Sequence, residues 1–165
     1  MKKYLMTGII ITSVCLLSFK NQNNQRNDFA GLWQLVSIES IAKDSSVTYP
    51  YGEKPMGRMM IDKEGNYMVE IYTTTRAKIA SGSKSTATPE ENIMMVKGSN
   101  AHFGKFMADT NTKTLLYKPE GAFFPNWEGQ DLKSVYTFEN GVLKSYSSNT
   151  TFGGSKAIVT WQKKM

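Results

Sequence analysis

Short turn sequences recur along the chain and confine most of it to antiparallel β-structure. Asn140-Gly141 supplies the two positive φ angles that a tight type I′ hairpin turn requires. Residues 63–65 and 109–112 are two further short turn sequences between β-prone segments. Strands joined by so few residues must pair antiparallel, because a parallel pair needs a crossover of roughly a dozen residues or more.

The segments between these turns are apolar and rich in β-formers. The predicted strands are residues 32–40, 57–62, 66–73, 101–108, 113–117, 132–139, 142–148 and 157–162. About eight short strands without a parallel-crossover pattern predict an all-β fold, a closed antiparallel barrel with no unpaired edges. Such a barrel encloses either packed side chains or one small ligand, and the sequence leaves both possibilities open.

Alternation within the strand over residues 66–73 separates two faces without deciding which one lies inside. Tyr67, Val69 and Ile71 share one face, and residues 68, 70 and 72 share the other. The second face mixes apolar and polar side chains, so it is either the outside of the barrel or a cavity wall with a few polar groups.

One short helix is predicted among the strands. Thr88 is placed as the N-cap, Pro89 at the first helical position and Glu91 as the acidic partner of a capping box. Residues 92–97 continue the helix and Gly98 ends it. The preceding Ser/Thr/Gly/Lys-rich residues 80–87 predict a mobile loop.

The first twenty residues have the pattern of a secretory signal peptide. Lys2 and Lys3 precede an almost uncharged apolar run over residues 4–19. That run is shorter than the roughly 20 residues that span a bilayer as a helix, which favours a cleaved signal over an uncleaved signal-anchor. We therefore expect an exported protein of the periplasm or cell envelope, with a polar tether over residues 21–28 and the barrel domain over residues 29–165.

The single cysteine, Cys15, lies within the apolar run and not in the barrel domain. It is a candidate for lipidation, although Thr12 and Val14 differ from the residues that usually precede a bacterial lipoprotein cysteine. The alternative is a small apolar residue of the signal. Contact with a membrane is predicted only through the N-terminal signal or a lipid anchor. The domain itself has no cysteine for a disulfide, a thiolate nucleophile or a metal site.

Charge and motif content argue against several classes of function. The net charge of +6 falls to +3 without residues 1–20, which hold three lysines and no acidic residue. The remaining basic residues are scattered, whereas nucleic-acid binding requires a concentrated basic face. The domain has no phosphate-binding glycine loop, no histidine pair at metal spacing and no nucleophile elbow. We therefore predict no nucleic-acid partner, no cofactor, no metal and no catalytic residue.

His102 is the only histidine, and any acid–base chemistry by histidine must use it. Its aromatic neighbourhood in a strand is more typical of a side chain that hydrogen-bonds a neighbour than of a general base. Glu128 and Asp131 lie near aromatic residues, where burial raises the pKa of a carboxyl group, so an acid–base role for either stays open.

Several motifs, in order, resemble the bacterial and fungal lipocalin-like domain family over about residues 30–163. They are Gly31-Leu32-Trp33, Tyr49-Pro50-Tyr51-Gly52, Gly65-Asn66-Tyr67-Met68, Thr88-Pro89-Glu90-Glu91, Phe103-Gly104, Phe124-Pro125-Asn126-Trp127 and Val159-Thr160-Trp161. The resemblance implies a lipocalin-type barrel that holds small apolar ligands. The chain departs from the family at Tyr117, Lys133 and His102, where relatives often carry histidine, arginine and an aromatic residue.

The resemblance also implies that Trp33 closes one end of the barrel beneath a basic side chain, either Lys163 or Arg58. For the Phe-Pro-Asn-Trp motif we predict a structural corner, with a place at the ligand mouth as the alternative. Arg76 is predicted at a loop edge, or, if it points inward, as the partner of a ligand carboxylate.

The first functional hypothesis is binding of a small apolar or amphipathic molecule inside the barrel. The predicted ligand-binding residues are Met60, Tyr72, Arg76, His102, Phe106, Phe124, Trp127 and Tyr136. Alternatives are a small barrel enzyme of isomerase or cyclase type that uses His102 and a cavity carboxylate, and a packed envelope domain that acts through its surface. A monomer or weak dimer is expected.

Overall fold

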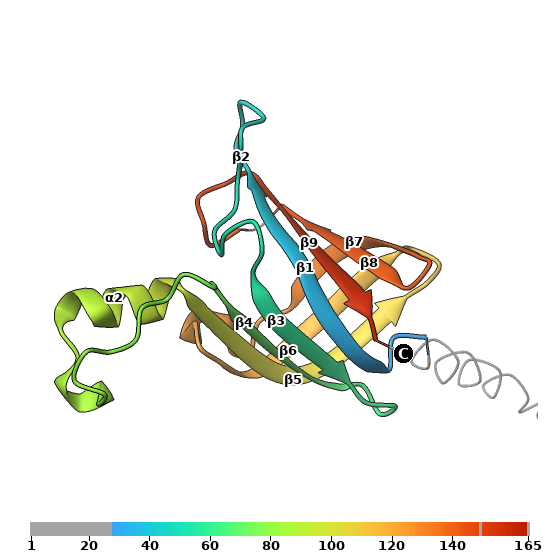
Figure 1. Ribbon diagram of the computed structural model, residues 1–165. Coiled ribbons are helices and arrows are strands. Elements are labelled where there is room, and N and C mark those ends of the chain that lie inside the picture. Colours follow the sequence, from blue (N-terminus) through green and yellow to red (C-terminus); the bar gives the residue numbers. More distant parts are fainter. Residues whose placement is uncertain (1–27, 149, 165) are drawn as a thin grey trace, which may run out of the picture.

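The computed structural model describes residues 28–148 and 150–164, which form a closed antiparallel β-barrel (Figure 1). The strands are β1 (Gly31–Ile41), β2 (Val47–Thr48), β3 (Met56–Ile61), β4 (Asn66–Tyr72), β5 (Ser99–Asp109), β6 (Thr114–Ala122), β7 (Leu132–Glu139), β8 (Val142–Ser147) and β9 (Lys156–Lys163). Each strand from β3 to β8 pairs with the next strand in the sequence, and β1 pairs with both β3 and β9. The predicted all-β barrel is confirmed, with β2 as an extra short strand on β1.

The predicted turn residues adopt the backbone angles that tight hairpins need, and so they fix the register of the paired strands. Asn140 and Gly141 both have positive φ angles, 51° and 76°, in the tight turn between β7 and β8. Gly65 has a φ angle of 77° between β3 and β4. In this register Tyr67 and Val69 lie opposite Ile61 and Met59, and all four side chains are buried. The face of β4 that carries Tyr67, Val69 and Ile71 is therefore the inner one, and Met68 and Glu70 lie on the outside of the barrel.

Two irregularities in the pairing change the alternation that a simple strand would follow. The register of β1 against β9 shifts between Leu35 and Ser37, so Val36 points outward and the inner face resumes at Ile38. The register of β5 against β6 shifts at Gly104. A Cβ atom at Gly104 would lie 2.1 Å from the carbonyl oxygen of Lys118, so this bulge requires glycine.

An aromatic cluster fills the end of the barrel where β1 begins. Trp33 is fully buried and donates from Nε1 to the carbonyl oxygen of Phe29, at 2.9 Å. The Phe29 ring contacts Phe106, Tyr136 and Phe138, with centroids 5.3–5.5 Å away. These contacts close this end of the barrel with apolar side chains.

A basic side chain covers this aromatic end, as the resemblance implied. The Nζ atom of Lys163 lies 5.5 Å from the centre of the Trp33 ring and donates to the carbonyl oxygen of Asp28 at 2.6 Å. Of the two candidates from the sequence, Lys163 is therefore the one over Trp33. The guanidinium of Arg58 instead donates to the carbonyl oxygen of Gly57.

The helix α2 (Pro89–Lys97) has the predicted caps. The Thr88 hydroxyl accepts from the backbone N–H of Glu91, and the Glu91 carboxylate accepts in return from the backbone N–H of Thr88. Gly98 is the C-cap. A short 3₁₀ turn, η1 (Lys84–Thr86), lies in the predicted loop. None of the helical residues is buried, and Figure 1 shows α2 projecting from the barrel.

The segment between β6 and β7 differs from the sequence prediction. Strand β6 continues past Tyr117 to Ala122, because its pairing with β5 extends beyond its pairing with β7. Pro119 lies in this extension, where β7 no longer needs a backbone N–H from β6. A single 3₁₀ turn, η2 (Pro125–Trp127), then turns the chain toward β7.

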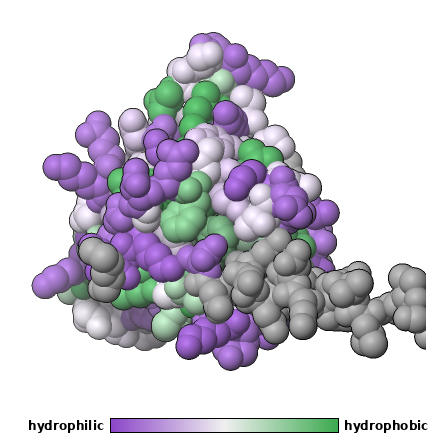
Figure 2. All heavy atoms as spheres, turned by 90° about the vertical axis from the view of Figure 1, so that its right-hand side faces the viewer, coloured by the Kyte–Doolittle hydropathy of each residue, from purple (hydrophilic) through white to green (hydrophobic). Residues whose placement is uncertain are grey.

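Hydrophilic and apolar side chains both reach the outer surface of the barrel. Figure 2 shows one face of the barrel with apolar areas enclosed by hydrophilic ones. The predictions for residues 1–20, for Cys15 and for the tether up to residue 27 lie outside the described residues. Within the described ranges, no helix is long and apolar enough to cross a membrane.

Candidate functional site

A cavity of about 340 Å³ lies inside the barrel, away from the aromatic end. Side chains from β1 and from every strand between β3 and β9 line it, so it is the interior of the closed sheet and not a surface groove. Its volume is at the lower end of the range for small-molecule sites. The exposed side chains of Asp131, Lys133 and Phe152 mark its mouth.

One wall of the cavity is apolar. It consists of inward-facing side chains that barrel closure brings together: Ile38, Met59, Val69, Ile71, Val159 and Trp161. Strand alternation directs each of them inward, and the bulge at Val36 is what returns Ile38 to the inner face. This wall can hold hydrocarbon without losing hydrogen bonds, because it offers almost no polar atoms.

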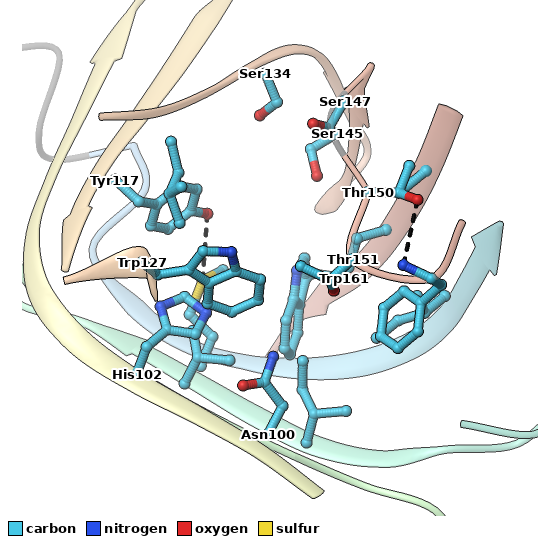
Figure 3. Close-up of a pocket in the computed structure, with 18 of the residues that line it drawn as sticks. Asn100, His102, Tyr117, Trp127, Ser134, Ser145, Ser147, Thr150, Thr151 and Trp161 are labelled. Carbon is cyan, nitrogen blue, oxygen red and sulfur yellow. Dashed lines mark hydrogen bonds between the residues drawn. The ribbon is translucent and has the colours of Figure 1, made fainter. Parts of the chain in front are cut away.

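Strand β5 contributes two polar side chains to the cavity. Asn100 and His102 are two residues apart, so both face inward, and Figure 3 shows them beside Trp161 and Trp127. The sequence singled out His102 but not Asn100. Strand alternation could have identified Asn100, because an inward-facing His102 places residue 100 on the same face.

His102 is held by a tyrosine and surrounded by aromatic rings. Its Nδ1 atom lies 2.9 Å from the hydroxyl oxygen of Tyr67, a hydrogen bond. The rings of Trp127 and Tyr117 pack edge-on against it, with centroids 5.4 Å and 6.2 Å away. Burial lowers the pKa of His102 to about 4. The imidazole is therefore neutral at physiological pH, with a tyrosine rather than a carboxylate as its hydrogen-bond partner.

The tyrosines that line the cavity or contact His102 are also uncharged at physiological pH. Burial raises the pKa of Tyr51 to about 12, and hydrogen bonding with the Asn100 amide opposes part of that rise. Burial likewise raises the pKa values of Tyr67 and Tyr117 well above their usual range. The Tyr117 hydroxyl donates to the Met59 sulfur at 3.5 Å. The cavity interior therefore presents neutral polar groups.

Hydroxyl side chains form the side of the cavity that faces β5 (Figure 3). They come from β7, β8 and the following loop: Ser134, Ser145, Ser147, Thr150 and Thr151. The Thr150 hydroxyl donates to the carbonyl oxygen of Gly154 and accepts from the backbone N–H of Phe152, which fixes the loop at the mouth. The cavity is therefore apolar along one wall and hydroxyl-rich along another.

Trp127 connects the η2 corner to the cavity. Its backbone N–H donates to the carbonyl oxygen of Phe124, and its ring packs edge-on against the rings of Phe124 and His102. It also lines the cavity. Trp127 therefore belongs both to the structural corner and to the cavity lining, which the sequence analysis gave as alternative roles of the Phe-Pro-Asn-Trp motif.

We expect replacement of Trp127 by alanine to lower the free energy of unfolding by about 1–2 kcal/mol. That is less than the about 3–5 kcal/mol of a fully buried aromatic side chain, because Trp127 is only half-buried. Thermal unfolding measures the change. Phe123→Ala is the matched control, since Phe123 is 48% exposed in the same segment. A melting temperature equal to that of the Phe123→Ala variant would show that Trp127 does not support the corner.

Two of the predicted ligand-binding residues, His102 and Trp127, line the cavity, and the structure places the other six elsewhere. Phe106 and Tyr136 are buried in the aromatic end. Met60 is 50% exposed on the outer face of β3, and Phe124 is 40% exposed beside Trp127.

Arg76 and Tyr72 pair with each other outside the cavity. The guanidinium carbon lies 4.1 Å from the centre of the Tyr72 ring, and Nε donates to the carbonyl oxygen of Thr73. The loop-edge position predicted for Arg76 is the one observed, and Arg76 is not available to a ligand carboxylate within the cavity.

Sequence reasoning missed most of the cavity lining. Tyr51 and Trp161 lie in motifs for which no cavity role was predicted, Asn100 lies in no motif, and the hydroxyl side was not anticipated. Strand alternation carried a signal for residues on recognised strands, but Thr150 and Thr151 lie in a loop that only the fold brings to the mouth. Across residues 28–148 and 150–164, no group of three or more His, Cys, Asp or Glu side chains is placed to hold a metal ion.

Comparison with known protein families identifies the family of the chain. Residues 30–164 match a protein family described as a lipocalin-like domain. No curated protein and no solved structure matches the chain.

Proposed function

The chain belongs to the lipocalin-like domain family, and on that premise we propose that it binds a small apolar or amphipathic molecule inside its barrel. The observation that carries this proposal is the cavity of about 340 Å³, which every strand of the closed barrel lines. A barrel of eight strands can equally be filled by its own side chains. Here the aromatic cluster fills only one end.

The composition of the lining supports an amphipathic ligand. The apolar wall matches a hydrocarbon portion, and the Asn100, His102 and hydroxyl groups match a small polar portion. Binding sites for small molecules commonly combine an apolar lining with a few placed polar groups. The mouth lies among loops at the end of the barrel opposite the buried Trp33.

A cavity-filling substitution tests the proposal directly. We expect the neutral fluorescent probe N-phenylnaphthylamine to bind the purified protein with increased emission. We expect Ala157→Phe to weaken that binding at least about tenfold, because the new ring occupies the cavity that Ala157 lines. A tenfold loss corresponds to about 1.4 kcal/mol of binding free energy. Fluorescence titration measures both dissociation constants.

The matched control is Ala101→Phe, the same substitution between the inward-facing Asn100 and His102 and so on the outer face of β5. Circular dichroism establishes that both variants are folded. Equal binding by Ala157→Phe, Ala101→Phe and the unmodified protein would place the probe outside the cavity. Failure of the unmodified protein to bind this probe and a panel of fatty and isoprenoid molecules would overturn the proposal.

A further inference from the structure

The amide of Asn100 has one polar atom without a hydrogen-bond partner. The residue is 8% exposed, lines the cavity and follows α2 at the start of β5. Its Oδ1 atom is buried and has no partner among the described residues. Figure 3 shows the amide reaching into the cavity between His102 and Trp161. A buried carbonyl oxygen of this kind is uncommon in folded proteins, because its lost hydration is normally replaced by a hydrogen bond.

The neighbouring His102 offers the complementary group. The described partner of the Tyr67 hydroxyl is the Nδ1 atom of His102. If the imidazole donated from Nδ1, the hydroxyl hydrogen would lack an acceptor, so the tyrosine donates and Nδ1 accepts. The neutral ring then carries its hydrogen on Nε2. Nε2 has no hydrogen-bond partner among the described residues, and the ring lines the cavity.

These two groups form a matched pair on one face of β5. The backbone positions of residues 100 and 102 are about 6.5–7 Å apart, from the rise of about 3.3 Å per residue. Figure 3 shows the amide oxygen of Asn100 on the side toward the His102 ring, so the two polar groups lean toward each other. Asn100 presents an acceptor and His102 presents a donor. A hydroxyl group between them can donate to the first and accept from the second, whereas a carboxylate can only accept.

The charge around the cavity also favours an uncharged ligand. Apart from the neutral His102, the basic side chain that lines the cavity is Lys133, which is exposed at the mouth. Arg76 lies outside, stacked on Tyr72. A carboxylate placed beside Asn100 would therefore be buried without a cationic partner, which is strongly unfavourable.

We propose that the cavity selects amphipathic ligands with an uncharged hydroxyl head group, which donates to Asn100 Oδ1 and accepts from His102 Nε2. The hydrocarbon portion lies against the apolar wall around Val69 and Ile71. This inference rests on the proposed function and adds the chemical class of the head group. It makes Asn100 a residue that determines specificity rather than stability.

The test compares three probes that share one hydrocarbon chain: decanol, methyl decanoate and decanoate. Each is titrated at pH 7 against the protein carrying N-phenylnaphthylamine, and displacement gives its affinity. We expect decanol to bind about five- to tenfold more tightly than methyl decanoate, which only accepts hydrogen bonds. We expect decanoate to bind at least about a hundredfold more weakly than decanol, because its charge is buried without a partner.

Asn100→Leu removes the acceptor at nearly constant side-chain volume. We expect it to reduce decanol affinity about five- to tenfold and to change methyl decanoate affinity less than about twofold. Its melting temperature is expected to change little, because removal of the unpaired Oδ1 atom offsets the loss of the hydrogen bond between the Asn100 amide and the Tyr51 hydroxyl. Asn111→Leu is the control, since Asn111 is exposed in the turn between β5 and β6.

The outcomes separate the two proposals. Binding of all three probes with equal affinity, or tightest binding of decanoate, would overturn the head-group inference and leave ligand binding intact. Equal loss of decanol and methyl decanoate in Asn100→Leu would also overturn it. Absence of any displacement, with no binding of the fluorescent probe itself, would overturn the proposed function. If Asn100→Leu does not fold, the ranking of the three probes on the unmodified protein still decides.

Discussion

Replacing Trp33 with alanine is expected to lower the free energy of unfolding by about 3–5 kcal/mol, the range for a fully buried aromatic side chain. Trp33 is 0% exposed, its ring contacts Phe29 and Phe138, and its Nε1 satisfies the carbonyl oxygen of Phe29. Alanine would leave a cavity that the surrounding strands cannot close, because they are fixed by pairing on both sides. Urea-induced unfolding followed by circular dichroism measures the loss.

Two further variants accompany Trp33→Ala. One is a control for truncation of an exposed side chain, and the other tests the charge over Trp33. Met68→Ala, at a side chain 53% exposed on the outer face of β4, is expected to change stability by less than about 0.5 kcal/mol. Lys163→Met keeps most of the side-chain volume and removes the charge over Trp33, with an expected loss of about 0.5–1 kcal/mol. A loss below about 1 kcal/mol in Trp33→Ala would contradict the view that this residue closes the barrel.

Acidification from pH 7 to pH 5 is expected to destabilise the protein through protonation of His102 in the unfolded chain. The pKa of His102 is about 4 in the folded protein, because burial disfavours the charged ring, and about 6.5 in the unfolded chain. Between these values the unfolded chain binds more protons, so stability falls as the pH falls. The full contribution is present above pH 6.5. About 3 kcal/mol is lost across the whole window, of which about 2 kcal/mol is lost between pH 7 and pH 5.

The loss of stability between pH 7 and pH 5 is specific to His102 for two reasons. His102 is the only histidine of the chain. Hydrogen bonds lower the pKa values of several exposed acidic residues, and those groups affect stability only below their unfolded pKa of about 4. They are Asp44, Asp62, Glu91 and Asp109.

Chemical denaturation at pH 7, 6 and 5 measures the slope, and a proton NMR titration of the single imidazole gives its pKa in the folded state. His102→Phe keeps an aromatic ring beside Trp127 and Tyr117 and removes the titrating group. We expect its stability to be nearly constant between pH 7 and pH 5. A folded-state pKa near 6.5 would show that the ring is solvated and would contradict the described burial.

Local sequence signals predicted the elements of the fold well. Asn140-Gly141, Gly65 and the Thr88 capping box act through their own backbone geometry, so their effects do not depend on distant residues. Strand β2 and the extension of β6 past Tyr117 were missed, because each exists only through pairing with another strand.

The candidate site was predicted far less completely. Met60 and Phe106 were both proposed as ligand contacts, yet one lies on the outer face of the barrel and the other in the aromatic end. Asn100 was not proposed at all. A pattern of alternation assigns residues to two faces but does not say which face is inside, nor at what height along the barrel each side chain lies.

The sequence by itself determined the order of the hairpins and the capped helix, because turns, caps and apolar strands act locally. Only the tertiary structure decided where the cavity lies and which side chains meet in it. The physical reason is that β1 and β9 close the barrel across more than a hundred residues, and bulges at Val36 in β1 and at Glu120 in β6, opposite Gly104, reset which side chains point inward. Asn100 and His102 therefore become part of a cavity wall only when the sheet closes.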